Sequence, residues 1–261
     1  MFFLISSIAV LGNADSGADE TSARFDAASV VVREDGVSIT VGPEGGSAEE
    51  ISAELMLVAT GRAANIEQIG LETTRVKTER GVIVVDDHMR TAEPHVWAIG
   101  DIVGGLWLAH TAGHEGLIAA HTIAGEEVHG MDYVAQPRAT YCRPEIASVG
   151  LTEEQCKERG LDYRVGRMPF MAVAKALIGG EYEGFAKVIL DTATGDTLGI
   201  HIVGPHATDL IAEGALAFTL DATPWEIGNT THAHPTLSET LMESAEVFFG
   251  HSTHVFKPKR K

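Results

Sequence analysis

The sequence is poor in cysteine, and this limits the classes of protein to which it can belong. Its two cysteines, Cys142 and Cys156, are too far apart for a Cys-x-x-Cys redox or zinc motif. Small secreted scaffolds held together by disulfides carry more cysteines than this. We therefore expect a cytoplasmic protein in which both cysteines are buried or inert thiols.

Basic residues are also scarce. The chain has 19 Lys and Arg against 37 Asp and Glu, a formal net charge of −18. Such a surface repels phosphate, which argues against nucleic acid as a partner and disfavours anionic membranes. The exception is a basic tail at residues 251–261, ending in Lys-Pro-Lys-Arg-Lys, which we expect to be solvated.

No apolar run is long enough to cross a membrane. The run from Met1 to Gly12 falls short of the about 20 residues that a transmembrane helix needs, and no Lys or Arg precedes it as in a signal peptide. We leave residues 1–23 as an unassigned leader. The sequence also contains neither a P-loop nor a G-x-G-x-x-G dinucleotide fingerprint.

The first half of the chain carries strand signals. Residues 28–32 and 37–41 predict two strands joined by a hairpin turn at Glu34-Asp35-Gly36. The apolar run at residues 55–59 is typical of a strand buried on both faces. Shorter strands are expected at residues 83–85 and 96–99, and a helix at 108–124 that ends at Gly125.

From about residue 137 the pattern becomes that of an α+β domain, in which strands alternate with packed helices. Thr152 and Gln155 fit a capping box at the start of the first helix. The last helix places Leu237, Leu241, Met242, Ala245 and Phe248 on one face. Strands are expected at residues 147–149, 186–190 and 198–203, and helices at 152–160, 207–219 and 235–249.

The most informative motif is His-Ala-His-Pro-Thr-Leu-Ser-Glu at residues 232–239. An imidazole titrates near neutral pH and is the usual proton acceptor in thiol chemistry, and a carboxylate can orient it. His234 and Glu239 fit such a pair. The same residues also fit a capping box with Thr236 as N-cap and Glu239 at N3, and the residues alone favour that interpretation.

A metal site is a further alternative for this motif. The histidines come in two pairs, His232 with His234 and His251 with His254. Zinc needs three or four converging ligands, whereas these pairs are separated by a predicted helix and no cysteine lies near either. The metal hypothesis is therefore the weakest of the three.

Two further segments could bind a ligand. Gly100 and Asp101 follow the expected strand at 96–99, and ligands of open α/β sheets bind beyond the carboxyl ends of strands. A turn aspartate without a ligand is the alternative. Residues 58–62, Val-Ala-Thr-Gly-Arg, form a weaker motif that also fits a plain exit turn from a strand.

Together, in this order and spacing, the three segments resemble the pyridine-nucleotide disulfide oxidoreductases, from about Arg24 to Phe249. Residues 143–152, Arg-Pro-Glu-Ile-Ala-Ser-Val-Gly-Leu-Thr, look like the start of that family's interface domain. Within the family, residues 234–239 and the preceding Gly-Pro-His-Ala at 204–207 most resemble the dihydrolipoamide dehydrogenases.

The resemblance implies roles for individual residues. His234 would be the acid/base that takes a proton from the substrate thiol, Glu239 would orient it, and the His234-Pro235 bond would be cis. Asp101, preceded by Gly100, would bind the ribityl chain of FAD. The turn at Leu108, Ala109 and His110 would stabilise negative charge on the flavin ring. Gly61 and Arg62 would mark the exit from the NAD-binding domain.

The resemblance also implies a domain organisation. After the leader, we expect residues 24–62 to be the C-terminal remnant of an NAD-binding domain and 63–134 the C-terminal part of an FAD-binding domain. Residues 135–250 would be the interface domain, followed by the basic tail. The expected fold is thus α/β remnants followed by an α+β dimerisation domain.

The function expected from this resemblance is oxidation of dihydrolipoamide with NAD by way of FAD. The redox disulfide and both dinucleotide fingerprints of the family are missing from the sequence, so we expect an incomplete FAD site, a largely missing NAD site and no activity by the chain alone. Expected partners are a second copy in a homodimer, a 2-oxo acid dehydrogenase complex and a second chain that supplies the N-terminal half. The alternative is a non-catalytic fragment or dimerisation module.

Overall fold

The computed structural model describes residues 7–11, 26–42, 47–59 and 61–254. The chain divides into two compact units, Met1–Asn65 and Ile66–Lys261, and each is described by itself. The domain borders expected from the sequence remain predictions. Most of the expected leader and the end of the basic tail lie outside the described residues. Within that description, no helix is both long and apolar enough to cross a bilayer.

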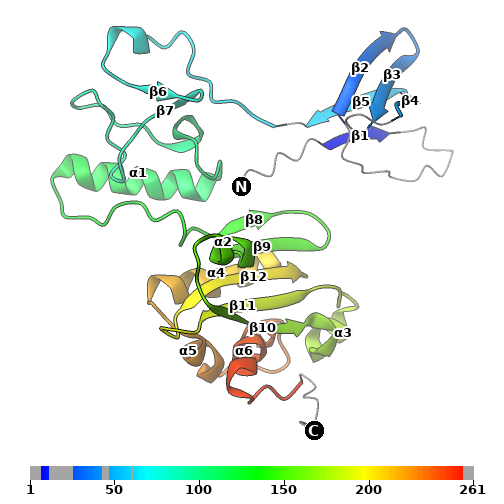
Figure 1. The fold of residues 1–261 in the computed structure, drawn as a ribbon, viewed down its shortest axis with the longest axis vertical. Helices are drawn as coiled ribbons and strands as arrows, with labels where there is room; N and C mark the ends of the chain where they lie inside the picture. Colours follow the sequence, from blue (N-terminus) through cyan, green and yellow to red (C-terminus); the bar gives the residue numbers. More distant parts are fainter. Residues whose placement is uncertain (1–6, 12–25, 43–46, 60, 255–261) are drawn as a thin grey trace. The chain divides into compact units, whose positions relative to one another are not determined.

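The first unit is built from antiparallel strands. The predicted hairpin is confirmed, since Glu34 and Asp35 form the turn between paired Arg33 and Gly36. Figure 1 shows β2 (Asp26–Arg33), β3 (Gly36–Gly42) and β4 (Glu49–Ala53) in one sheet and β1 (Ser7–Leu11) beside β5 (Leu55–Ala59) in another. Strand β1 arises from residues that we had left unassigned.

The prediction that residues 55–59 are buried on both faces is wrong. Leu55 is 70% exposed and Leu57 is 57% exposed. The strand pairs with β1 in a two-stranded sheet, and none of the described residues of this unit is helical. An apolar run is buried only where other residues pack on it, and the face that carries Leu55 and Leu57 stays open to solvent.

The second unit begins with short elements packed against one long helix. These are a 3-10 helix at Leu71–Thr73, β6 (Thr78–Glu79), β7 (Val82–Ile83), a 3-10 helix at Gly100–Val103 and α1 (Ala109–Ala124). Helix α1 ends at Gly125, as predicted. It buries Ile118 and Ala119 against Met89 and Met131.

The strand expected at residues 96–99 is reduced to one isolated bridge between Arg90 and Trp97. Val96 is 38% exposed and Ile99 is 40% exposed, so the segment lacks the neighbours that a strand needs on both sides. Asp101 therefore follows an isolated bridge rather than a sheet strand, and it lies in the 3-10 helix Gly100–Val103.

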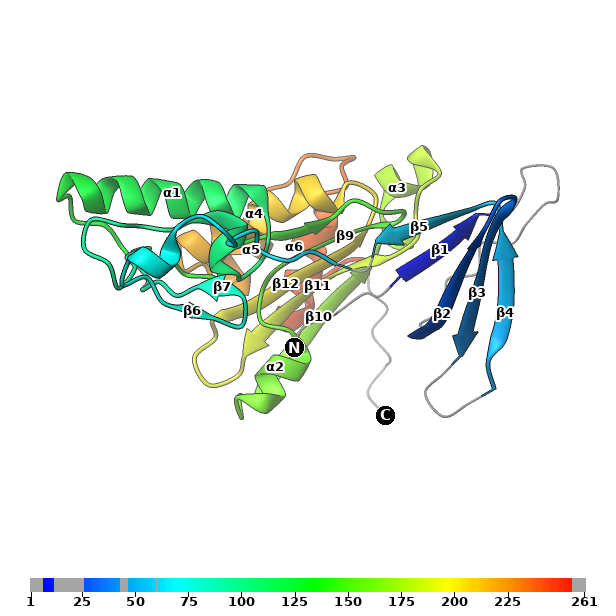
Figure 2. The same ribbon diagram turned by 90° about the horizontal axis from the view of Figure 1, so that it is seen from above.

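The rest of this unit is centred on a five-stranded antiparallel sheet in the order β10-β11-β12-β9-β8. Three of its strands were predicted, and β8 and β10 were not. In Figures 1 and 2 the helices α4, α5 and α6 lie together against the sheet. The strands are β8 (Arg138–Thr140), β9 (Glu145–Gly150), β10 (Tyr163–Pro169), β11 (Phe185–Asp191) and β12 (Thr197–Gly204).

Both faces of this sheet are covered, as neighbouring residues of β11 show. Val188 belongs to the main core with Ile211 and Leu241, whereas Ile189 packs with Cys156 of α2. Successive side chains of a strand point to opposite faces, so the two clusters lie on either side of the sheet. The helices are α2 (Glu153–Glu158), α3 (Ala174–Gly179), α4 (Ala207–Thr219), α5 (Pro224–Asn229) and α6 (Glu239–Glu246).

Of these five helices, the sequence predicted α2, α4 and the region of α6, but not α3 or α5. Helix α4 has the predicted bounds, and the capping box of Thr152 and Gln155 is formed at the start of α2. Cys156 is buried, as expected, and burial raises the pKa of its thiol. Cys142 is exposed in the loop after β8, so of the two alternatives, buried or inert, only an inert thiol remains for it.

The last helix begins later than predicted. Residues 235–249 were expected to be helical, but α6 begins at Glu239 and is followed by a 3-10 helix at Val247–Phe249. The residues before it form a turn, in which the Thr236 hydroxyl donates to the Ala233 carbonyl. Leu241, Ala245 and Phe248 of the predicted apolar face are buried.

Candidate active site

His234 and Glu239 form the expected pair. The His234 Nδ1 lies 2.9 Å from the Glu239 Oε1, and the His234-Pro235 bond is cis, as expected. The imidazole is 68% exposed, whereas the carboxylate is 13% exposed. Since a carboxylate accepts hydrogen bonds, Nδ1 carries the proton and the lone pair of the neutral ring is on Nε2. The pair thus presents a base to solvent.

The competing capping box is half formed. The second oxygen of Glu239 accepts from the Thr236 amide at 2.8 Å, which is one of the two bonds of the box. The other bond is missing, because α6 has Ser238 as its N-cap and the Thr236 hydroxyl donates to the Ala233 carbonyl. Burial raises the pKa of Glu239, but the bonds from Thr236 and His234 outweigh it and lower the pKa overall. Glu239 therefore stays ionised and fixes the orientation of His234.

A second histidine–glutamate pair lies beside the first, and sequence reasoning missed it. The His232 Nε2 is 2.8 Å from Glu213 of α4, and its Nδ1 is 2.7 Å from the Thr230 carbonyl. The bond to Glu213 raises the pKa of His232. Glu213 is distant in sequence, so no local spacing marked it. This pair fixes the start of the loop that carries His234.

The paired histidines do not form a metal site. Among the described residues, the one group of His, Cys, Asp and Glu side chains close enough to hold an ion is Asp86, Asp87 and His88. His232, His234, His251 and His254 are instead each paired with a glutamate.

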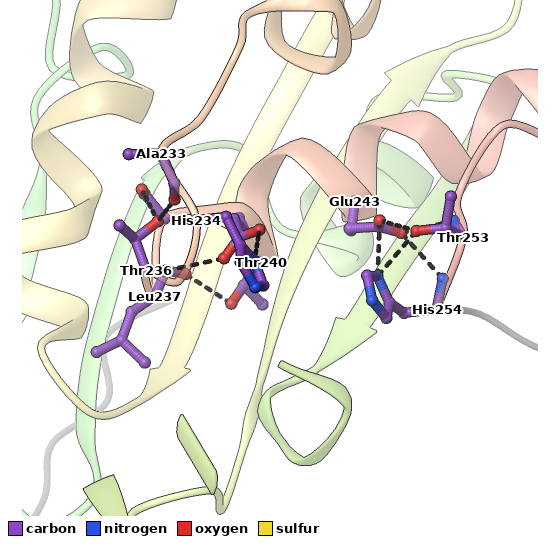
Figure 3. Close-up of polar contacts among 10 residues, drawn as sticks. Ala233, His234, Thr236, Leu237, Thr240, Glu243, Thr253 and His254 are labelled. Atoms are coloured by element: carbon purple, nitrogen blue, oxygen red, sulfur yellow. Dashed lines mark hydrogen bonds and ion pairs between the residues drawn. The ribbon is translucent and has the colours of Figure 1, made fainter. Parts of the chain in front are cut away.

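Helix α6 supplies three of these glutamates, Glu239, Glu243 and Glu246. Glu243 is 4% exposed and accepts from the Ser252 hydroxyl and from the backbone amides of Thr253 and His254. The Thr253 hydroxyl and His254 Nδ1 add bonds of 2.6 and 2.8 Å (Figure 3). Burial opposes ionisation, yet these bonds lower the pKa of Glu243 to about 2. Glu246 forms an ion pair with His251 at 3.3 Å.

The second candidate region lies where the 3-10 helix Gly100–Val103 packs against α1. Leu108 is the N-cap of α1 and Ala109 its first residue, so the free amides of the first turn are here. The buried Thr111 hydroxyl in that turn has no hydrogen-bond partner among the described residues. The His110 Nε2 is 2.8 Å from the Pro137 carbonyl.

These features suit one end of a flavin. A carboxylate such as Asp101 accepts hydrogen bonds from polyol hydroxyls, and a helix N-terminus stabilises negative charge on a ring oxygen or nitrogen. The Thr111 hydroxyl is a polar group in that turn whose bonding capacity is unused. The donor set therefore fits the ribityl chain and the ring of FAD.

Sequence reasoning missed the most buried group of this region, Glu115 of α1. Its side chain is 1% exposed and accepts from the Gly100 amide at 2.6 Å and from the Tyr133 hydroxyl at 2.8 Å. Burial, together with the bond to Glu115, raises the pKa of Tyr133. The one sequence signal was that Glu115 is the only Asp, Glu, Lys or Arg residue in α1.

Comparison with known proteins shows that two models of one family match the two candidate regions. The model of the pyridine nucleotide-disulphide oxidoreductase dimerisation domain matches residues 136–245, which include His234 and Glu239. The model of the pyridine nucleotide-disulphide oxidoreductases matches residues 21–116, which include Asp101 and Leu108. The chain belongs to the pyridine nucleotide-disulphide oxidoreductases. Its α/β fold with a dimerisation domain is that of the family.

Curated relatives show which enzyme of the family the chain is similar to. The chain is 52% identical over 203 residues to a dihydrolipoyl dehydrogenase of Bacillus subtilis, covering 78% of this chain and 43% of the relative. It is 44% identical over 224 residues to the dihydrolipoyl dehydrogenase of Geobacillus stearothermophilus, covering 85% and 47%. The chain is therefore dihydrolipoyl dehydrogenase-like and spans about half the length of the curated relatives it matches.

Solved structures share the fold of this chain. LpdA from Mycobacterium tuberculosis superposes with a TM-score of 0.78 and 30% identity, covering 86% of this chain and 48% of LpdA. The flavoprotein disulfide reductase RclA from Escherichia coli gives a TM-score of 0.75 at 24% identity, covering 86% and 50%, which shows a shared fold alone.

Proposed function

We propose that this chain provides the acid/base group and the flavin contacts of a dihydrolipoamide dehydrogenase, which oxidises dihydrolipoamide with NAD by way of FAD. The observation that carries the proposal is the His234–Glu239 pair, at 2.9 Å between Nδ1 and Oε1. The dihydrolipoyl dehydrogenase relatives support the choice of substrate.

His234 would act through its exposed nitrogen. Glu239 holds the Nδ1 proton, so Nε2 is free to accept a proton from a substrate thiol, and the thiolate formed is the better nucleophile. The imidazolium that results is stabilised by the ionised Glu239. Proton transfer of this kind contributes roughly 10²–10⁴ in rate.

The flavin contacts would come from the 3-10 helix Gly100–Val103 and the first turn of α1. A bound FAD would supply the redox chemistry that links oxidation of the dithiol to reduction of NAD. Asp101, beside Gly100, would hold the ribityl chain, and the turn at Leu108, Ala109 and His110 would direct the positive end of α1 to the ring. The strands of the first unit would belong to the NAD-binding domain.

The proposed reaction needs parts that the printed sequence does not contain. It has no pair of closely spaced cysteines and no G-x-G-x-x-G fingerprint. In this proposal the redox disulfide and the sites for the cofactor pyrophosphates come from elsewhere, for example from a second polypeptide. The expected assembly is a cytoplasmic homodimer that serves a 2-oxo acid dehydrogenase complex.

A dimerisation module without catalysis is the second candidate. The observation that favours it is the closed architecture of residues 138–249, where the five-stranded sheet is covered on both faces and has its own core. A domain with its own core can associate without an active site elsewhere.

The test is to complement the full chain with the N-terminal half of the Bacillus subtilis relative and to measure dihydrolipoamide-dependent reduction of NAD. We expect activity with bound flavin, and a loss of about 10²–10⁴ in rate for His234→Gln. The matched control is His129→Gln, because His129 is exposed and lies outside both candidate regions.

The outcomes separate the two candidates. Flavin binding and activity that depend on His234 would support the enzyme. A complemented protein that dimerises but binds no flavin would favour the dimerisation module, and an unchanged rate for His234→Gln would remove the acid/base assignment.

A further inference from the structure

Glu115 is a carboxylate that the proposed mechanism does not use, although it is buried to 1% exposure. Burying an ionised carboxylate is costly unless hydrogen bonds compensate for its lost hydration. Both oxygens of Glu115 have a partner, the Gly100 amide at 2.6 Å and the Tyr133 hydroxyl at 2.8 Å. A bond to a charged acceptor is roughly twice as strong as a neutral one.

The first partner belongs to the turn that would contact flavin. Gly100 adopts a left-handed conformation with φ of 78° and directly precedes Asp101. The bond from its amide to Glu115 joins this bend to the middle of α1, whose first turn is the other proposed flavin contact. One carboxylate therefore fixes the spacing of the two contacts.

The second partner belongs to the segment that enters the dimerisation domain. The Tyr133 carbonyl accepts from Arg138 of β8 at 3.4 Å, and the next carbonyl, that of Val134, accepts from the Gly150 amide of β9 at 3.0 Å. Tyr133 is thus anchored to the sheet of the domain that carries His234, while its hydroxyl reaches Glu115.

We propose that Glu115 is a positioning residue, which ties the Gly100–Asp101 turn to the dimerisation domain through Tyr133 and so holds the flavin contact in place. This role rests on the proposed flavin site. Loss of the carboxylate would leave Asp101 intact but free to shift relative to α1, and flavin affinity would fall.

The first measurement tests the link itself in the full chain, without flavin. Ultraviolet titration of the tyrosines in Glu115→Gln should show Tyr133 ionising at lower pH than in the parent, because the neighbouring negative charge is gone. Glu127→Gln is the matched control, since Glu127 is exposed and the net charge changes equally. An unchanged titration in Glu115→Gln would contradict the link.

The second measurement is FAD affinity in the complemented protein. We expect Glu115→Gln to weaken FAD binding by about tenfold or more, Tyr133→Phe by less, and Glu127→Gln not at all. Coupling is reciprocal, so saturating FAD should raise the pKa of Tyr133 further in the parent, which a merely structural role would not produce.

The outcomes are distinguishable. Unchanged FAD affinity in Glu115→Gln, with the Tyr133 titration shifted, would overturn the positioning role while leaving the flavin site standing. If Glu115→Gln does not fold, an unchanged FAD affinity in Tyr133→Phe would overturn it in the same way. No FAD binding by the parent would contradict the proposed function on which this role rests.

Discussion

At the scale of single residues, buried glutamates join separate segments of the chain through hydrogen bonds. Glu243 accepts five hydrogen bonds from residues 252–254 and joins the chain after α6 to that helix. Each bond favours the ionised form, which is why the pKa falls to about 2 despite burial. The position of the segment after α6 therefore depends on the negative charge of Glu243.

This charge predicts how stability depends on pH. The pKa of Glu243 is lowered in the folded chain, so its contribution is fully present above the unfolded value of 4.5 and is lost as pH falls toward about 2. We expect it to be worth roughly 3 kcal/mol at neutral pH. Urea unfolding between pH 7 and pH 2 should show this loss in the parent.

The matched variants are Glu243→Gln and Glu154→Gln. Glu154 is an exposed glutamate of α2, and its loss should leave the pH dependence as it is. In Glu243→Gln, the acid-dependent part of the unfolding free energy should become smaller. Equal pH profiles for this variant and the parent would contradict the assignment.

Residues differ in how far the sequence could predict their contacts. His234 and Glu239 are close in sequence and lie before a helix, so their pairing could be proposed from spacing and chemistry. The partners of Glu115 and His232 are fixed by the tertiary fold, since Tyr133 and Glu213 come from other segments. No local pattern marks such contacts.

At the scale of elements, end signals determine where the helices begin. Thr152 accepts from the Gln155 amide, and the Gln155 side chain accepts from the Thr152 amide. We expect Thr152→Ala to reduce the unfolding free energy by about 1 kcal/mol, because the Gln155 amide loses the hydroxyl oxygen that accepts its hydrogen bond. Thr152→Ser keeps a hydroxyl and should be nearly neutral, and chemical denaturation compares the two. Equal losses would show that the hydroxyl is not the cause.

Elements with strong local signals were predicted, and those that depend on neighbours were not. Helix α4 and the hairpin of β2 and β3 followed from periodicity and turn residues. The residues at 96–99 have the composition of a strand, but among them only Trp97 forms a β-bridge. Thr236 fits an N-cap, yet Glu239 bonds to its amide and to His234, and α6 begins after Ser238. The first case depends on neighbouring segments, whereas the second depends on the local contacts of Glu239 with Thr236 and His234.

At the scale of the whole molecule, the matched dimerisation domain predicts self-association. We expect sedimentation of the full chain at micromolar concentration to give twice its mass of 27.8 kDa. Stable dimers of this kind bury large, mostly apolar interfaces, so the association should persist in high salt. A monomer under these conditions would contradict the proposed homodimer.

The three glutamates of α6 also bear on how this helix could change during evolution. Glu239, Glu243 and Glu246 each pair with a histidine on a neighbouring stretch of chain. Inserting or deleting one residue in an α-helix turns everything beyond it by about 100°. A length change near the start of α6 would misplace two partners at once, so we expect natural variation in this helix to occur by substitution and not by insertion or deletion.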